Sequence, residues 1–270
     1  MEYTINIKGK LMTFDEPAVM GILNVTPDSF YAPSRIDITL IVERAKAMLD
    51  AGAKILDIGA CSTRPGAEYA TEEAELERLH RVLDVLDKEL PQAVISLDTF
   101  RARVVRECVG SHNISIINDV SGFDWDDDML SAVIDARMPY ILTHSAMCDV
   151  NKPVLPQVLK CLADKIWTLH THGVADVIVD PGFGFEKNLE QNYELMAGLG
   201  EFSILDTPLL VGVSRKSMIT KLLEIPSSEA LVGTVALNMY ALSNGADILR
   251  VHDVAEATQV VKMWRALNVK

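Results

Sequence analysis

The chain has 270 residues and a formal net charge of −13, from 25 lysines and arginines against 38 aspartates and glutamates. This acidic balance disfavours nucleic acids and anionic membrane surfaces as partners, because both are bound by clustered positive charge. With 49% hydrophobic and 23% charged residues, the composition is that of a globular protein. The length suits one large domain.

Eight short apolar runs recur along the chain, about 33 residues apart, which is the length of one strand–helix unit. They cover residues 19–24, 55–59, 93–98, 114–118, 140–144, 177–180, 209–214 and 247–252. Continuous apolar runs are typical of strands in a parallel sheet that is covered on both faces. Between them, residues 38–52, 71–88 and 254–267 have helical periodicity, and Thr71 is the expected N-cap of the second helix.

Eight alternating strand–helix units without a linker predict a single (β/α)8 TIM barrel over residues 1–270. A doubly wound open sheet is the alternative fold. It usually carries a glycine fingerprint after its first strand, and the chain has neither G-x-G-x-x-G nor a Walker loop. The barrel is therefore the expected architecture.

The cysteines and the first residues indicate a cytoplasmic protein. The four cysteines form no C-x-x-C pair, so a disulfide framework and a zinc site are both disfavoured. Residues 1–4 show no basic region followed by an apolar core, as a secretory signal would. The uncharged stretch 230–246 is interrupted by polar residues, which predicts a buried helix and no membrane span.

Polar side chains follow nearly every predicted strand, at the end where barrel enzymes carry their active sites. These residues are Asn24, Asp98, Asn118, His144, Asp180, Arg215, Lys216, Arg250 and His252. The two aspartates and Asn118 could satisfy a flat heterocycle with N–H and C=O edges. Arg64 and the cations near the last two strands occupy the usual phosphate position of the fold. The residues thus predict a site for a heterocycle and a phosphate-bearing group.

The same residues carry a resemblance to the dihydropteroate synthase family. Seven blocks match its pattern in order: 20–30 (MGILNVTPDSF), 62–66 (STRPG), 98–100 (DTF), 118–122 (NDVSG), 180–185 (DPGFGF), 214–217 (SRKS) and 250–253 (RVHD). The resemblance runs from about residue 19 to the C-terminus. The chain departs from the pattern at 31–34 and 60–61, and at 143–148 (THSAMC) it has a shorter loop.

The resemblance implies a folate-pathway transferase that joins 6-hydroxymethyl-7,8-dihydropterin diphosphate to 4-aminobenzoate with the help of Mg2+. Pyrophosphate and 7,8-dihydropteroate would be its products. It also implies a homodimer whose partners are these small molecules. By the same resemblance, Arg64, Asp98, Lys216 and His252 would be the catalytic residues.

The resemblance also assigns ligand contacts. Asp98, Asn118, Asp180 and Lys216 would hold the pterin, with Arg250 stacked on its face. The diphosphate would be held by Thr63, Arg64, Arg250 and His252, and Asn24 would bind the Mg2+. The aminobenzoate pocket would be shaped by Thr63, Pro65, Phe185 and Ser217.

Two alternative functions use much of the same site. A corrinoid-type pterin methyltransferase would share the pterin residues, but it would not need Arg64 or the 214–217 block. A non-catalytic pterin-binding homologue is suggested by the altered loops. Such a protein would be expected to have lost Asn24, Arg64 or His252, and all three are present.

Overall fold

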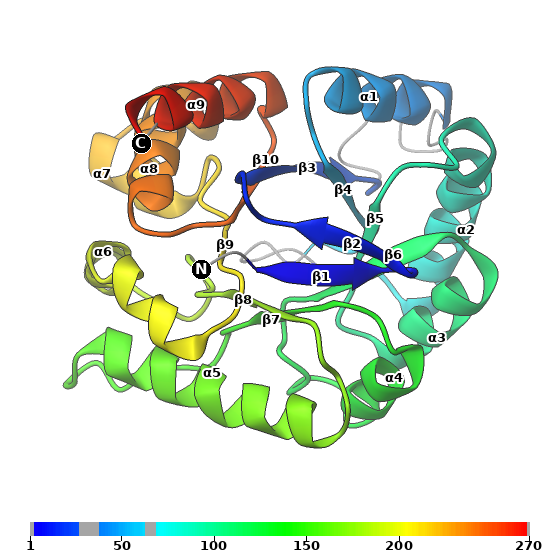
Figure 1. The fold of residues 1–270 in the computed structure, drawn as a ribbon, viewed down its shortest axis with the longest axis horizontal. Helices are drawn as coiled ribbons and strands as arrows, with labels where there is room; N and C mark the ends of the chain where they lie inside the picture. Colours follow the sequence, from blue (N-terminus) through cyan, green and yellow to red (C-terminus); the bar gives the residue numbers. More distant parts are fainter. Residues whose placement is uncertain (1–2, 27–37, 63–68, 269–270) are drawn as a thin grey trace.

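The computed structural model describes residues 3–26, 38–62 and 69–268, which form a barrel of parallel strands surrounded by helices (Figure 1). The strands are β3 (Ala18–Asn24), β4 (Ile55–Gly59), β5 (Ile95–Asp98), β6 (Ile114–Asp119), β7 (Tyr140–Thr143), β8 (Val177–Asp180), β9 (Leu210–Val211) and β10 (Ile248–Val251). They are hydrogen-bonded in the order β8-β7-β6-β5-β4-β3-β10-β9, and a parallel bridge between Val179 and Leu209 joins the two ends. The predicted (β/α)8 barrel is confirmed.

Helices follow the strands and cover the outside of the barrel (Figure 1). They are α1 (Ile38–Asp50), α2 (Glu72–Glu89), α3 (Ala102–Ser111), α4 (Met129–Ala136), α5 (Val154–Thr171), α6 (Leu189–Ala197), α7 (Ser217–Leu223), α8 (Leu231–Ser243) and α9 (Val254–Leu267), with the 3-10 turns η2 (Leu199–Leu205) and η3 (Ser227–Glu229). The predicted helices at 38–52, 71–88 and 254–267 are confirmed within two residues. Thr71 caps α2 as expected, since its hydroxyl oxygen accepts a hydrogen bond from the Ala74 amide.

The strands divide their side chains between the barrel interior and the helical layer, because consecutive strand residues point to opposite faces. In β4, Leu56 and Ile58 belong to the outer core beneath the helices, whereas Ile55 belongs to a separate inner cluster. Asp57 has the same parity as Ile55 and is 1% exposed. An acidic side chain is therefore enclosed inside the barrel. In the described part of the chain, no helix is long and apolar enough to cross a membrane.

An N-terminal hairpin closes the bottom of the barrel, a feature that the sequence analysis did not predict. Its antiparallel strands β1 (Thr4–Ile7) and β2 (Lys10–Thr13) are joined by Lys8 and Gly9, both with positive φ, as a two-residue hairpin turn requires. Ile5 and Phe14 pack into the inner apolar cluster. Figure 1 shows the hairpin lying across the barrel, so the mouth at the opposite end is the place for a ligand.

Candidate active site

Strand register brings several predicted site residues to one level around the mouth. Asn24 pairs with Gly59, Gly59 with Asp98, and Asp98 with Asn118, so the ends of β3 to β6 are level. Gly59 makes room for its neighbour, because a Cβ atom there would lie 3.2 Å from the Asp98 carboxylate oxygen Oδ2. The four strand ends thus present an amide, a gap, a carboxylate and a second amide in sequence around the rim.

Arg250 ties two carboxylates together at the floor of the site. Its Nε donates to Asp57 Oδ2 at 2.6 Å, and its Nη2 donates to Asp98 Oδ2 at 2.7 Å. Asn118 Nδ2 donates to both oxygens of Asp57, at 3.2 and 3.1 Å. Although burial works against its charged form, Asp57 and Asp98 raise the pKa of Arg250 above its usual value. The guanidinium plane is consequently fixed, as a stacking surface requires.

Asp57 is the site residue that sequence reasoning missed, although a signal was present. It is a lone carboxylate inside an apolar strand, with the parity of the inward-facing residues. Such a group is costly to bury unless it is paired and hydrogen-bonded, and here Arg250 and Asn118 supply both. Asp57 therefore orients two residues predicted to touch the heterocycle.

Asp98 has an unusual proton affinity. Burial and the nearby Asp57 carboxylate raise its pKa to about 7, while Arg250 acts in the opposite direction. Its side chain is 22% exposed, so it remains accessible from the mouth. A carboxyl group with a pKa near neutrality in a cleft is characteristic of functional sites.

Asp180 and Lys216 face each other across the junction of β8 and β9. Burial raises the pKa of Asp180, although the Lys216 ammonium and the Gly182 amide favour its charged form. Gly182 N–H donates to Asp180 Oδ1 at 2.8 Å. Burial likewise lowers the pKa of Lys216 to about 8, opposed by Asp180. Lys216 Nζ donates to the Phe183 carbonyl at 2.7 Å, so the ammonium is held over the mouth.

Phe185 and Ser217 lie on the same side of the mouth as Lys216. The Lys216 ammonium is 4.9 Å from the centre of the Phe185 ring, within the range of a cation–π contact. Ser217 begins α7 and lines a cavity of about 580 Å³ together with Gly184, Lys187 and Gln191. The Ser217 hydroxyl therefore lies at an open volume whose lining also includes Gly184 and Glu186, the two chain neighbours of Phe185.

The cations that follow β9 and β10 have different environments. The Ser214 hydroxyl and His252 Nδ1 share a hydrogen bond of 3.1 Å, and Ser214 Oγ also accepts from the His252 amide, which orients the imidazole. Arg215 instead makes a bidentate pair with Asp253, with both distances 2.8 Å. Its Nη1 donates to two carbonyls of η3. Arg215 therefore fastens two loops together, and the expectation that it adds to a phosphate site does not hold.

Asn24 is the one predicted metal ligand. It is half-buried at the end of β3, and its side-chain amide makes no hydrogen bond within residues 3–26, 38–62 and 69–268. In those residues no group of three or more acidic, histidine or cysteine side chains could hold a metal ion. The predicted residues Thr63, Arg64 and Pro65 lie outside the described residues.

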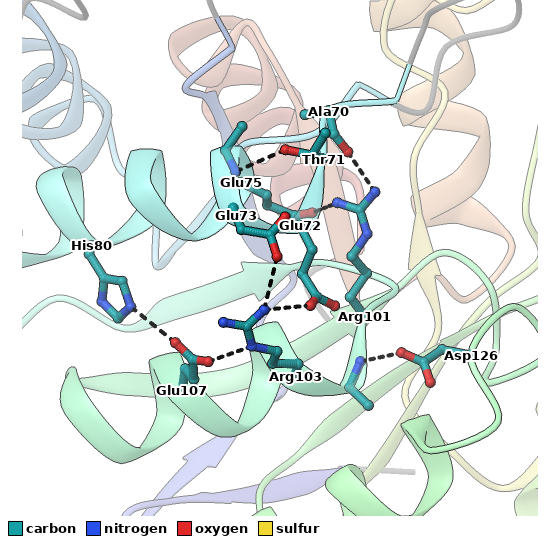
Figure 2. A network of polar contacts seen from close by, with 12 residues as sticks. Ala70, Thr71, Glu72, Glu73, Glu75, His80, Arg101, Arg103, Glu107 and Asp126 are labelled. Atoms are coloured by element: carbon teal, nitrogen blue, oxygen red, sulfur yellow. Dashed lines mark hydrogen bonds and ion pairs between the residues drawn. The ribbon is translucent and has the colours of Figure 1, made fainter.

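A second polar network, at the start of α2 and α3 (Figure 2), supports the backbone of the site next to Asp98. The Glu75 carboxylate is fully buried between Thr99 and Arg101: Thr99 Oγ1 donates to it at 2.7 Å, and Arg101 Nη1 also contacts it. Arg101 Nη2 donates to the Ala70 carbonyl. Because Thr99 follows Asp98 directly, the network fixes the backbone that carries the Asp98 carboxylate.

Comparison with known proteins agrees with a barrel whose mouth is built for a heterocycle. The family described as pterin binding enzyme matches residues 20–252, so the chain belongs to this family. Within it, the similarity is to dihydropteroate synthases. The dihydropteroate synthase of Escherichia coli strain K12 is 37% identical, over 96% of this chain and 94% of its own length.

Solved structures of dihydropteroate synthases have the same fold as this chain. A Xanthomonas albilineans dihydropteroate synthase with 4-aminobenzoic acid is 34% identical with a TM-score of 0.92, covering 100% of both chains. The same organism's enzyme in complex with 7,8-dihydropteroate is 32% identical with a TM-score of 0.89, covering 99% of this chain and 100% of that one. The chain is thus a member of the dihydropteroate synthases within the pterin-binding enzymes.

Proposed function

We propose that this chain condenses 6-hydroxymethyl-7,8-dihydropterin diphosphate with 4-aminobenzoate, releasing pyrophosphate and forming 7,8-dihydropteroate. The observation that carries this proposal is the floor of the mouth. There Asp57, Arg250 and Asp98 are linked by hydrogen bonds of 2.6 and 2.7 Å, with Asn118 bound to the first of them. This arrangement presents donors, acceptors and a fixed planar cation to a flat polar ring.

The pterin would lie on this floor. Ionised Asp98 and Asp180 can accept hydrogen bonds from ring and amino N–H groups, and Asn118 has both a donor and an acceptor. The Lys216 ammonium has three N–H donors, of which one is engaged with the Phe183 carbonyl, so it can also donate to a ring oxygen or nitrogen. Arg250, held at its edge by two carboxylates, would stack on the face of the ring.

The reaction breaks the bond between the pterin methylene carbon and the diphosphate oxygen, and the electron pair leaves with pyrophosphate. The aniline nitrogen forms the new bond to this carbon and then loses a proton to water. Negative charge grows on the leaving group, and Arg64, Arg250 and His252 would stabilise it. Positive charge grows on the pterin methylene, where the Asp98 and Asp180 carboxylates oppose it. No strong protein base is needed.

Mg2+ is the proposed cofactor. Asn24 fits such an ion, because its amide oxygen is a hard ligand at the mouth without a hydrogen-bond partner in the described residues. Magnesium sites commonly use one or two protein oxygens together with substrate phosphates. When bound, the ion would supply charge neutralisation to the leaving pyrophosphate.

The aminobenzoate would enter last, between the pterin and the Phe185 ring. Phe185 and Ser217, with Thr63 and Pro65, would form its walls. The cavity of about 580 Å³ beside Ser217 leaves room for the benzoate end of the molecule. In this pose the amine nitrogen would face the methylene carbon on the side of the pterin away from Arg250, which would stack on the ring.

Steady-state assays of pyrophosphate release test the proposal. Purified protein with Mg2+ is expected to release pyrophosphate only when both substrates are present, with dihydropteroate formed in equal amount. Asp180→Ala should weaken binding of a pterin fragment by about tenfold or more, because a charge-assisted hydrogen bond contributes roughly 1.5–3 kcal/mol. Asp164→Ala, at an exposed position on α5, is the matched control.

Each result has a distinct meaning. EDTA should depress turnover far more than binding of the bare pterin, and turnover that is indifferent to divalent metal contradicts the Mg2+ assignment. Unchanged pterin affinity in Asp180→Ala contradicts the pocket. Transfer of a methyl group to a corrinoid, without pyrophosphate chemistry, would favour the methyltransferase alternative.

We also propose that the protein is a homodimer through α8. The buried face of this helix carries Thr234 and Asn238, while Val232 and Tyr240 are 79% and 42% exposed. A helix with apolar side chains toward solvent is expected to pack against another surface. Val232→Glu should therefore lower the sedimentation mass to that of a monomer, and Leu11→Glu, at an exposed hairpin position, should not.

A cytoplasmic location completes the proposal. All four cysteines are free thiols, as expected in a reducing compartment. Two measurements test this location. The cells that make the protein are fractionated, and the denatured protein is then titrated with a thiol reagent. Four reactive thiols per chain in the cytoplasmic fraction are expected, and a disulfide-bonded form would contradict it.

A further inference from the structure

Lys187 occupies an unusual position in the loop between β8 and α6. Its ammonium turns back into this loop and donates to three backbone carbonyls: His144 at 3.1 Å, Gly182 at 3.0 Å and Phe185 at 3.0 Å. A lysine ammonium has three N–H donors, so all of them are engaged. In the described part of the chain no carboxylate lies within ion-pair distance of it.

This environment is expensive for a cation. Burial lowers the pKa of Lys187 to about 8, with Lys216 acting in the same direction and Cys148 and Asp180 opposing it. The neighbouring His144 is uncharged at neutral pH, because burial and then Lys187 lower its pKa to about 3. A buried charge without a counter-ion is a poor way to stabilise a fold, since an apolar side chain could fill the space at lower cost. The arrangement therefore suggests a geometric role.

Two of the three carbonyls that accept from Lys187, those of Gly182 and Phe185, belong to the loop that carries residues of both substrate pockets. Gly182 donates its N–H to Asp180 Oδ1, and its φ of +71° places it in the left-handed region. A Cβ atom at Gly182 would lie 1.9 Å from the His144 carbonyl oxygen, so the two loops touch there. Phe185, the third partner, places its ring beneath Lys216.

We propose that Lys187 is a positioning residue for the transfer reaction: its ammonium gathers the carbonyls of His144, Gly182 and Phe185 and fixes the Phe185 ring relative to the Asp180 carboxylate. Asp180 is also held by β8, whereas Phe185 lies in the loop itself. Loss of Lys187 should therefore disturb the aminobenzoate wall more than the pterin pocket. This inference rests on the proposed function.

Kinetics of Lys187→Met test it, since methionine keeps an unbranched side chain of similar length and removes the charge. The KM for aminobenzoate should rise roughly tenfold or more, because small misplacements of positioning groups carry large kinetic costs. The KM for the pterin diphosphate should change much less. Lys187→Arg, which keeps a cation, should restore part of the loss. Lys160→Met is the control, because Lys160 is an exposed lysine on α5 paired with Asp164.

Amide hydrogen exchange tests the geometry without substrate. Residues 181–188 should exchange about tenfold faster or more in Lys187→Met, with the remainder of the barrel unchanged. Unaltered kinetics and exchange would overturn the inference while leaving the proposed function intact. Faster exchange throughout the barrel, with both KM values raised and no rescue by arginine, would also overturn it. If the wild-type protein forms no dihydropteroate, the proposed function fails and the exchange result alone decides the role of Lys187.

Discussion

Replacing Asp57 with asparagine removes one negative charge from the floor of the site while nearly keeping its shape. Asp57 Oδ2 and Asp98 Oδ2 lie 2.6 and 2.7 Å from the same Arg250 Nη2, so they are no more than about 5.3 Å apart (2.6 Å plus 2.7 Å). Two unit charges at this distance repel by about 3 kcal/mol at an effective dielectric constant of about 20. This energy corresponds to about 2 pH units. Asp57→Asn should therefore make Asp98 more acidic.

The profile of kcat/KM for the pterin diphosphate against pH measures this effect, because it reports groups of the free enzyme. In the wild type, activity should fall as pH drops through about 7, where Asp98 gains a proton, and again above about 8, where Lys216 loses one. Asp57→Asn should move the acidic limb down by about 2 pH units and leave the basic limb in place as an internal reference. An acidic limb that stays fixed or moves upward would refute the electrostatic reasoning.

Two further substitutions, each with a control variant, test the residues that support the site. Arg101→Met leaves the Glu75 carboxylate buried without its cation and should lower the free energy of unfolding by about 3–5 kcal/mol in urea titrations at pH 7, less at acid pH where Glu75 is neutral. Arg103→Met should cost less than about 1 kcal/mol, because the Arg103 side chain is 50% exposed and its pairs with Glu72, Glu73 and Glu107 (Figure 2) lie at the surface. Gly182→Ala should destabilise by more than about 1 kcal/mol and abolish tight pterin binding, because its Cβ would meet a carbonyl oxygen at 1.9 Å. Gly110→Ala, where a Cβ meets nothing within 4 Å, should be neutral or stabilising, and equal effects of the two would contradict the steric argument.

The fold could be predicted because its pattern is repeated. Apolar runs and amphipathic helices alternate eight times, and each unit supports the same assignment, so Thr71 and the limits of α2 followed from local chemistry. The hairpin at Thr4–Thr13 could not be found in this way. Its strands have four residues each, and only Ile5 of the first strand is buried, so alternation over so short a length gives little signal.

The site could be predicted only as a set of strand ends. Residues at or next to the ends of strands, such as Asp98 and Asn118, can be recognised in the sequence as polar residues that follow apolar ones. Asp57 sits one step deeper, and its role depends on Arg250, which is 193 residues away in the chain. Arg215 shows the converse error: of two adjacent basic residues, Lys216 donates to the Phe183 carbonyl, whereas Arg215 pairs with Asp253. Pairings across the barrel are set by tertiary structure, which a single sequence does not display.

The barrel closes between β8 and β9 through very few backbone contacts. β9 has two residues, and the junction is the parallel bridge between Val179 and Leu209, in which Val179 N–H donates to the Pro208 carbonyl at 2.9 Å. Next to this junction, the Lys216 ammonium donates to the Phe183 carbonyl and so links the segment after β9 to the segment after β8. A longer β9 would make this link through backbone hydrogen bonds. Local opening should begin at such a seam, exposing the Val179 amide before the rest of the sheet. A pterin held by both Asp180 and Lys216 would bridge this seam, so ligand binding would act as the missing part of the strand pairing and complete the cylinder.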